Sequence, residues 1–351
     1  MTPPWLLPFG MRNASNATHA NPITQARDGA ALPIRAAGAW GGLGVLVFSF
    51  SLPATRLAVK DLDPTFVGLG RALVAAVLAA ALLKLTRSPR PARADLPRFA
   101  LVGLGVVVGF PIFTSLALKH LSSAHASVIV GMLPAATAAV AVWRAHERPP
   151  RAFWLAAAAG LVAVLAFAAT QGAHGIEGAD LLVLIAVALC AFGYAEGGAL
   201  SRTYGGWQVI CWALVLTAPV LVVPVGIAAS NGVHASATAW LCFAYVAIFS
   251  MFLGFFAWYR GLALGGIAKI GQIQLAQPVL TLVWSALVLG EHVTAAMALT
   301  ALLVLACVLA TQRTRQPTTN ASGGSPSKPA ATPARALSSH TLASSENTTT
   351  S

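Results

Sequence analysis

Four polar side chains in otherwise apolar stretches are the strongest candidates for chemistry in this sequence. Arg71, Glu196, Gln274 and Gln277 each lie among runs of Ala, Leu, Val and Gly. Charged and amide groups are costly in such surroundings unless they face water, a partner or a ligand, so they mark functional positions. The sequence contains no nucleotide-binding loop, nucleophile elbow or metalloprotease motif. We therefore expect neither an enzyme nor a resident cofactor.

Glu196 is the only acidic residue well inside an apolar run, in CAFGYAEGGALSRTYG. A carboxyl group that takes up and releases a proton at such a position is a candidate proton carrier for substrate/proton antiport. The alternative is a structural carboxylate that reaches water or pairs with Arg202. The sequence leaves both readings open.

Arg71 lies about a third of the way into an apolar run. An Arg at the centre of a membrane helix costs about 2.5–3.5 kcal/mol on insertion scales, so its side chain should face inward and have a partner. Arg71 is a candidate for binding an anionic substrate group. The alternative is that it holds its helix against a carbonyl group or against Glu196.

The segment KIGQIQLAQP, residues 269–278, places several polar groups at the start of another apolar run. On a helical wheel Gln274 and Gln277 share one face, so both could hydrogen-bond one substrate, or they could bond between helices instead. Lys269 is expected to extend toward the membrane surface. Tyr194 and Tyr259 are candidates for a surface on which a substrate stacks, although aromatic residues near span ends also anchor helices at the interface.

Metal binding has little support in the sequence. His120 and His125 flank a short loop with no carboxylate nearby in sequence, and the four cysteines show no paired spacing. We therefore expect no metal site and no disulfide.

The elements that must position these residues are membrane helices. Of 351 residues, 57% are hydrophobic and 9% charged, against about 25% charged in a soluble domain. Apolar runs of about 20 residues without period-two alternation predict transmembrane helices. We expect an all-α protein with ten spans: 38–56, 64–84, 98–118, 124–143, 152–170, 179–200, 207–229, 238–259, 266–289 and 294–312.

The basic residues predict the orientation of these spans. Of 22 Lys and Arg, 17 fall in the two tails and in the loops after even-numbered spans, and only Arg56, Lys60 and Lys119 fall in the other loops. The positive-inside rule then places both termini in the cytoplasm. This distribution accounts for the net charge of +12 without nucleic acid. Residues 1–37 and 313–351 are expected as disordered cytoplasmic tails.

A short motif occurs twice, 144 residues apart: PAATAAVAVWRAHE at 134–147 and PVLTLVWSALVLGE at 278–291. The same shift lays the first five spans over the last five. Because each unit has an odd number of spans, the second enters the membrane from the other side, which predicts two inverted repeats over 38–172 and 173–312. The motif shares three residue types, in the pairs Pro134 and Pro278, Thr137 and Thr281, and Glu147 and Glu291.

Each member of the motif has an expected structural effect. Pro134 and Pro278 should kink their helices near mid-span, and Thr137 and Thr281 could bond back to the carbonyls of Leu133 and Gln277. The matched glutamates should mark opposite membrane faces, because Glu147 lies in a basic loop and Glu291 does not.

These features resemble the drug/metabolite transporter superfamily, in which two EamA-type domains form a ten-span chain. FFAWYRGLALGGIAKIGQIQLAQPVLTLVWSALVLGE, residues 255–291, is similar to the second-half motif of the family. TSLALKHLSSAHASVIVGMLPAATAAVAVWRAHE, residues 114–147, and LGRALVAAVL around Arg71 are similar to first-half segments. His146 departs from the family pattern, which usually has Gly before the glutamate. The resemblance covers residues 38–312.

The resemblance implies a secondary transporter of the bacterial inner membrane that works by alternating access. We expect it to export a small metabolite, such as an amino acid or related compound, or a drug, and proton coupling is one option. The partners expected are a small-molecule substrate and the lipid bilayer. Formation of a homodimer is a further possibility. A nucleotide-sugar-like exchanger, or a non-transporting membrane scaffold or sensor, are the alternatives.

Overall fold

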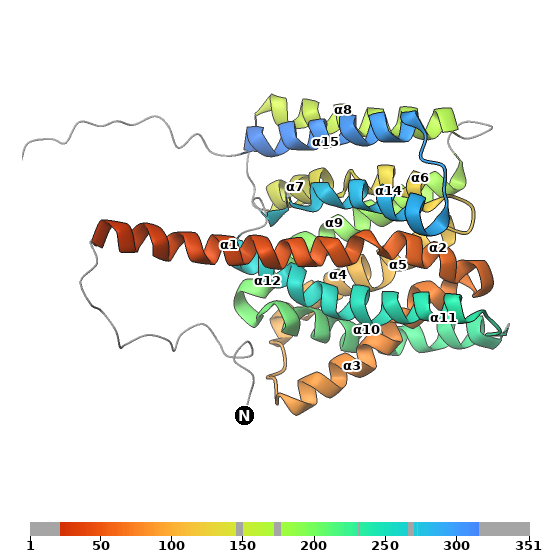
Figure 1. Ribbon diagram of the computed structural model, residues 1–351. Coiled ribbons are helices and arrows are strands. Elements are labelled where there is room, and N and C mark those ends of the chain that lie inside the picture. Colours follow the sequence, from red (N-terminus) through yellow and green to blue (C-terminus); the bar gives the residue numbers. More distant parts are fainter. Residues whose placement is uncertain are drawn as a thin grey trace, which may run out of the picture. The chain divides into compact units, whose positions relative to one another are not determined.

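The computed structural model describes residues 22–144, 150–171, 177–230, 232–265, 270–271 and 273–315 (Figure 1). All regular secondary structure in these ranges is helical. Glu147 and Lys269 lie outside the described residues, so the expectations for them have no structural counterpart. The all-α expectation is confirmed.

The described helices form ten groups, called spans one to ten, close to the expected ranges. Seven are long and apolar enough to cross a membrane, and spans five, nine and ten contain shorter apolar helices over the described residues. Spans one to five are α1 (Pro22–Ser49) with α2 (Ser51–Asp61); η1 (Phe66–Gly70) with α3 (Arg71–Leu85); η2 (Arg93–Asp95), α4 (Leu96–Val102), η3 (Gly103–Gly109) and α5 (Phe110–Ala117); α6 (Ser123–Val130) with α7 (Leu133–Arg144); and α8 (Arg151–Gln171). Spans six to ten are α9 (Gly178–Tyr204); α10 (Gly206–Ser230); α11 (Ala237–Ala244), η4 (Tyr245–Gly254) and α12 (Phe255–Gly265); η5 (Ile273–Leu275) with α14 (Ala276–Leu289); and α15 (Ala295–Arg315).

The first helix begins earlier than the sequence predicted. Residues 22–37 were expected as part of a disordered tail, but they are helical, and α1 starts at Pro22. Proline is well accommodated in the first turn of a helix, where its missing N–H would have no partner, and the alanines that follow have high helix propensity.

The two repeats pair helix by helix. Span one packs against span eight, two against seven, three against six, four against nine and five against ten. Figure 1 shows two of these pairs, α8 beside α15 and α6 beside α14. Exchanging the repeats leaves this set of pairs unchanged, as two-fold pseudosymmetry requires. The interface between the repeats therefore runs through the whole bundle.

Glycines let two of these pairs approach at backbone distance. A Cβ built on Gly105 of span three would lie 2.8 Å from the amide nitrogen of Gly193 in span six. A Cβ on Gly261 of span eight would lie 2.8 Å from the amide nitrogen of Gly41 in span one. Small residues at such positions allow close packing of membrane helices.

The repeat is also visible in irregular backbone. Spans three and eight each contain a π-helical segment, Gly103–Gly109 and Tyr245–Gly254, which overlap when shifted by 144 residues. The expected kinks in spans four and nine are helix breaks. Pro134 lies in the first turn of α7, after a turn at Gly131–Met132, and Pro278 lies in the first turn of α14, after the 3-10 turn η5. Proline fits a helix start because no intrahelical hydrogen bond is lost there.

Candidate functional site

A small cavity with both apolar and polar lining residues lies between the two repeats. Its volume is about 30 Å³, which is room for a water molecule or two. Three residues singled out from the sequence meet here, namely Arg71 of α3, Tyr194 of α9 and Gln277 of α14. The remaining lining residues come from spans one, three, six and eight: Phe48, Ser51, Leu52, Val106, Phe110, Cys190, Ser250, Met251 and Phe255.

Arg71 is buried and incompletely bonded. Its side chain is placed at the start of α3, and the residue is 3% exposed. Nη1 lies 3.5 Å from the hydroxyl of Thr55, a long contact, and Nε has no hydrogen-bond partner in the described part of the chain. In the described part of the chain, Glu196 is paired with Arg98 and Arg144 and no ion pair includes Arg71, so the alternative in which Glu196 holds Arg71 is wrong. A buried guanidinium group with unused donors is prepared to bind an anion.

The other polar groups of the cavity complement this cation. Among the described residues the buried Oε1 atom of Gln277 has no hydrogen-bond partner, so the cavity is lined by an unused acceptor as well as by the unused Nε donor of Arg71. The hydroxyls of Ser51 and Ser250 are joined at 2.7 Å and link span one to span eight. The ring of Tyr194 packs against that of Trp258, and the two ring centroids are 5.5 Å apart. The described lining contains one cationic side chain and no carboxylate.

Two predicted substrate residues lie elsewhere. Tyr259 is fully buried and donates to the carbonyl of Gly193 at 3.2 Å, so it joins span eight to span six. Gln274 is buried, and its Nε2 has no hydrogen-bond partner within the described ranges, but the residue is absent from the cavity lining. The prediction that Gln274 and Gln277 share one face was based on a continuous α-helix. In the structure Gln274 lies in η5 and Gln277 in α14. A 3-10 turn rotates more per residue than an α-helix, so the wheel does not hold there.

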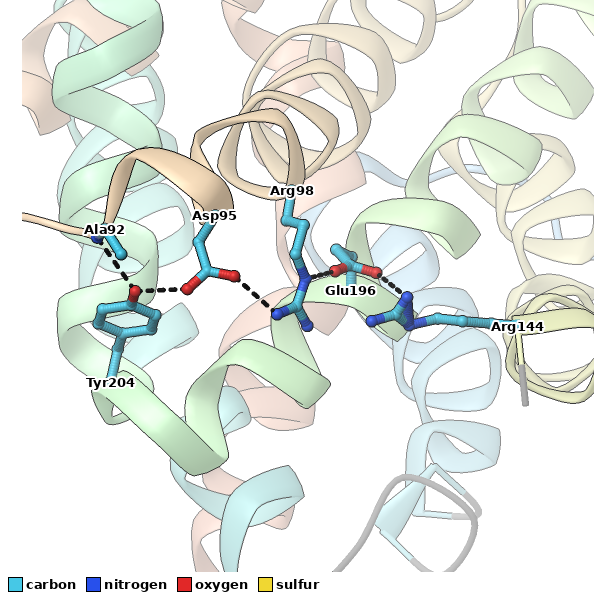
Figure 2. A network of polar contacts seen from close by, with 6 residues as sticks. All are labelled: Ala92, Asp95, Arg98, Arg144, Glu196 and Tyr204. Carbon is cyan, nitrogen blue, oxygen red and sulfur yellow. Dashed lines mark hydrogen bonds and ion pairs between the residues drawn. The ribbon is translucent and has the colours of Figure 1, made fainter.

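One end of the bundle, called the terminal end, is where span one begins and span ten finishes. There Glu196 of α9 accepts from two arginines, Arg98 of α4 and Arg144 of α7 (Figure 2). The Arg144 Nη1 to Glu196 Oε2 distance is 2.9 Å. The Glu196 side chain is 4% exposed, whereas those of Arg98 and Arg144 are 35% and 39% exposed.

The network continues to the loop before span three. Arg98 Nη1 donates to Asp95 at 2.9 Å, and the hydroxyl of Tyr204 donates to the other Asp95 oxygen at 2.6 Å (Figure 2). The amide of Ala92 donates to that hydroxyl at 3.2 Å. Ion pairs and hydrogen bonds thus join spans three, four and six across the repeat interface.

The expected pairing of Glu196 with Arg202 is wrong. Arg202 is exposed, and the partners of Glu196 come from the other repeat. Sequence reasoning missed Arg98 and Arg144 because both lie near span ends, where the positive-inside rule already explained them. The lone carboxylate of span six was the one available signal, since a buried charge requires a partner.

At the opposite end, carboxylates bind helix starts across the repeats. Glu291 accepts from the backbone amides of Ser123 and Ala124, at 3.0 and 2.9 Å, where α6 begins. Asp61 accepts from the backbone amide of Ser236 at 3.0 Å, just before α11. Negative groups stabilise helix starts because the amides of the first turn lack intrahelical acceptors. The sequence predicted Glu291 as a marker of one membrane face and did not predict these bonds to the start of α6.

A buried pair joins spans four and six at this opposite end. His125 Nε2 lies 2.7 Å from Asp180 Oδ1, and their side chains are 10% and 1% exposed. Asp180 also accepts from the amide of Glu177 at 3.0 Å, which completes a capping box at the start of α9. His125 was considered in the sequence only as a metal ligand, because its partner is distant along the chain.

The matched threonines differ in their bonds. Thr281 donates to the carbonyl of Ser49 at 2.7 Å, at the break between α1 and α2, and not to Gln277. The buried hydroxyl of Thr137 has no hydrogen-bond partner in the described part of the chain. Both back-bonding expectations are wrong. Span one is broken at Ser49 and offers a carbonyl, whereas span six is continuous at the matching position.

The helix pairing and the cavity lined by Arg71 and Gln277 define a class, namely a multi-pass membrane protein with two inverted five-helix repeats, the architecture of many secondary transporters. The model of the EamA-like transporter family matches residues 37–169 and 178–312. The chain belongs to the EamA-like transporter family. It is a membrane transporter and not an enzyme, and the resemblance drawn from the sequence is confirmed.

Two further comparisons agree. The chain is similar to the uncharacterized transporter YdeK of Bacillus subtilis (strain 168), with 47% identity over 275 residues, which are 78% of this chain and 96% of that relative. A solved crystal structure shares the fold, with a TM-score of 0.56 at 18% identity, and covers 78% of this chain and 97% of its own.

Proposed function

We propose that the protein is a secondary active transporter that exports a small metabolite across the bacterial inner membrane by alternating access. The observation that carries this proposal is the convergence of Arg71, Tyr194 and Gln277 on one cavity between the repeats. In this proposal both chain termini are cytoplasmic, so the terminal end of the bundle faces the cytoplasm, as the distribution of basic residues favours.

The two ends of the bundle supply the two gates. The Arg98, Glu196 and Arg144 cluster closes the cytoplasmic side, and the His125 and Asp180 pair closes the other side. Both are closed in the conformation described, and the cavity between them is about 30 Å³. Transport then requires one gate to open at a time, with the cavity widening as it opens.

The cavity chemistry favours a zwitterion such as an amino acid. The donors of Arg71 match a carboxylate, and the unpaired oxygen of Gln277 accepts from an ammonium group. Aromatic faces of Phe48, Phe110 and Tyr194 add favourable contact with a cation. A nucleotide sugar is disfavoured, because its two phosphates call for more than one lining cation.

Proton coupling is assigned to Glu196. A proton taken up by its carboxylate removes the charge that holds Arg98 and Arg144, so protonation and opening of the cytoplasmic gate are linked. In antiport, the proton would reach Glu196 from the outer side and leave to the cytoplasm as outward-bound substrate enters, after which the ionised carboxylate binds the two arginines again and the gate re-forms.

Counterflow into proteoliposomes, measured with a panel of radiolabelled amino acids and related metabolites, tests the proposal. We expect Arg71→Ala to abolish exchange and Gln277→Ala to weaken apparent affinity about tenfold, the effect of one lost hydrogen bond of about 1.4 kcal/mol. Gln274→Ala is the matched control, since it removes the same amide group three residues earlier in the chain, at a position outside the cavity lining. If no solute exchanges, or if Gln274→Ala is as impaired as Gln277→Ala, the assignment is wrong.

A further inference from the structure

A second hollow, called the lateral groove, lies apart from the central cavity. It has a volume of about 380 Å³ and is formed by spans one, seven and eight. None of its residues lines the central cavity. Leu43 and Leu253 are 48% and 42% exposed, so the groove opens on the outer surface of the bundle. Its lining residues are Trp40, Leu43, Gly206, Trp207, Leu253, Phe256, Ala257 and Arg260.

The lateral groove has apolar walls and one positively charged group. Leu43, Leu253 and Phe256 give it apolar walls, and Arg260 is its one charged lining residue. The guanidinium carbon of Arg260 lies 5.3 Å from the centroid of the Trp40 ring, which fixes the cation in place. Among the described residues, its buried Nε has no hydrogen-bond partner and no ion pair includes Arg260. The groove therefore holds a positive charge that no described protein group neutralises.

The start of α10 adds to this positive charge. The first backbone bond of the helix runs from Val209 to the carbonyl of Gly205, so the amides of residues 206–208 have no acceptor within the helix. Gly206 is also in contact with Arg260, because a Cβ there would lie 2.6 Å from the Arg260 amide nitrogen. The positive end of a 25-residue helix thus lies beside the backbone of Arg260, and both line the same groove.

The position of these groups along the spans matches a lipid headgroup. Arg260 is near the end of span eight, Gly206 starts span seven and Trp40 is near the start of the apolar part of span one, so all three lie toward the terminal end. Trp40 and Trp207 have the amphipathic rings that are enriched at membrane interfaces. Leu43 and Leu253 lie further into the apolar region of their spans.

We infer that the lateral groove binds an anionic phospholipid, with its phosphate on Arg260 and the start of α10 and an acyl chain along Leu43, Leu253 and Phe256. A negatively charged headgroup is required because a zwitterionic lipid carries its own cation beside the phosphate. This inference does not depend on the transported substrate or on the gates.

The test is native mass spectrometry and thermal unfolding of the full-length protein in detergent, titrated with phosphatidylglycerol, with phosphatidylethanolamine or with inorganic phosphate. We expect phosphatidylglycerol to remain bound and raise the unfolding temperature by several degrees, and the other two to do so at least tenfold more weakly. Arg260→Gln should remove this difference between the lipids. Arg202→Gln, which alters an exposed arginine outside the groove, is the matched control and should retain it.

A second variant distinguishes the contribution of the apolar wall to lipid binding from that of the charge. Leu43→Trp fills the apolar wall at a partly exposed position and should weaken binding of both lipids without altering Arg260. Equal binding of the two lipids by the unmodified protein would overturn the inference. So would full stabilisation by inorganic phosphate alone, which would indicate an ion site, or an unchanged phosphatidylglycerol effect in both Arg260→Gln and Leu43→Trp.

Discussion

The two ends of the helix bundle are closed by different chemistry. At the terminal end a buried carboxylate, Glu196, is bound by two arginines that are each more than a third exposed. At the opposite end, Glu291 binds backbone amides where α6 begins, and the His125 and Asp180 pair is almost fully buried. Exposed cations can be rehydrated as they separate, whereas backbone amides need another acceptor. We therefore expect the terminal end to open with the lower cost.

This difference arises where the repeats diverge in sequence. The position that matches Glu196 in the first repeat is Leu52, and the position that matches Asp180 is Ala36. The fold thus repeats while the closures do not. Pseudosymmetric helices form the cavity, and unmatched side chains decide how each end is held.

Of the substitutions that test this difference between the two ends, Glu196→Gln is expected to have the largest effect on stability. The substitution weakens two ion pairs at once, so we expect a loss of about 2–3 kcal/mol in the free energy of unfolding, less than for a fully buried pair. Arg98→Gln and Arg144→Gln each remove one pair and should cost less. Thermal unfolding of the three variants and of the double variants gives the coupling energies. Additive losses would contradict a shared carboxylate.

The same variant tests proton coupling in transport. With Gln in place of Glu196, substrate accumulation driven by a pH gradient should be lost, while exchange without a gradient should continue. Accumulation that is unchanged in Glu196→Gln would exclude proton transfer through this residue.

A smaller effect is expected at the opposite end from Glu291→Ala. The start of α6 loses the acceptor for two amides, which costs about 1–2 kcal/mol, as for the loss of a helix cap. Glu291→Gln keeps an acceptor oxygen and should recover part of this loss. Thermal unfolding at low and high salt separates the two ends, because partly exposed ion pairs at Glu196 should be the more salt-sensitive. The same salt dependence for both sites would contradict the contrast.

The smallest effect concerns the matched threonines. Thr281→Val removes the bond to the Ser49 carbonyl and should cost about 1 kcal/mol. Thr137→Val removes a buried hydroxyl that has no hydrogen-bond partner in the described residues, so the protein should be unchanged or slightly stabilised. Unfolding measurements on both variants in parallel decide the matter. Equal losses would show that the two repeats use this residue alike.

The sequence predicted those features that follow from the free-energy cost of placing a given residue type in a membrane. Apolar length located the spans, and Arg71 and Gln277, which were singled out because polar groups are costly in apolar runs, both line the central cavity. Their part in substrate binding stays a prediction. Partners could not be predicted in the same way. Glu196 is bonded to Arg98 and Arg144 because α4, α7 and α9 pack together at one end, and such packing depends on contacts between residues far apart in the chain.

The π-helical segments of spans three and eight have a consequence for movement. Val106 and Ser250 lie in these segments at matched positions, and both line the central cavity. A π segment uses i to i+5 bonds, so the loop closed by each hydrogen bond holds one more residue than in an α-helix. If that extra residue passes along the helix one hydrogen bond at a time, each side chain it passes turns about the helix axis while the span stays at its depth. The cavity walls could therefore exchange one set of side chains for another by rotation, without any helix sliding through the bilayer.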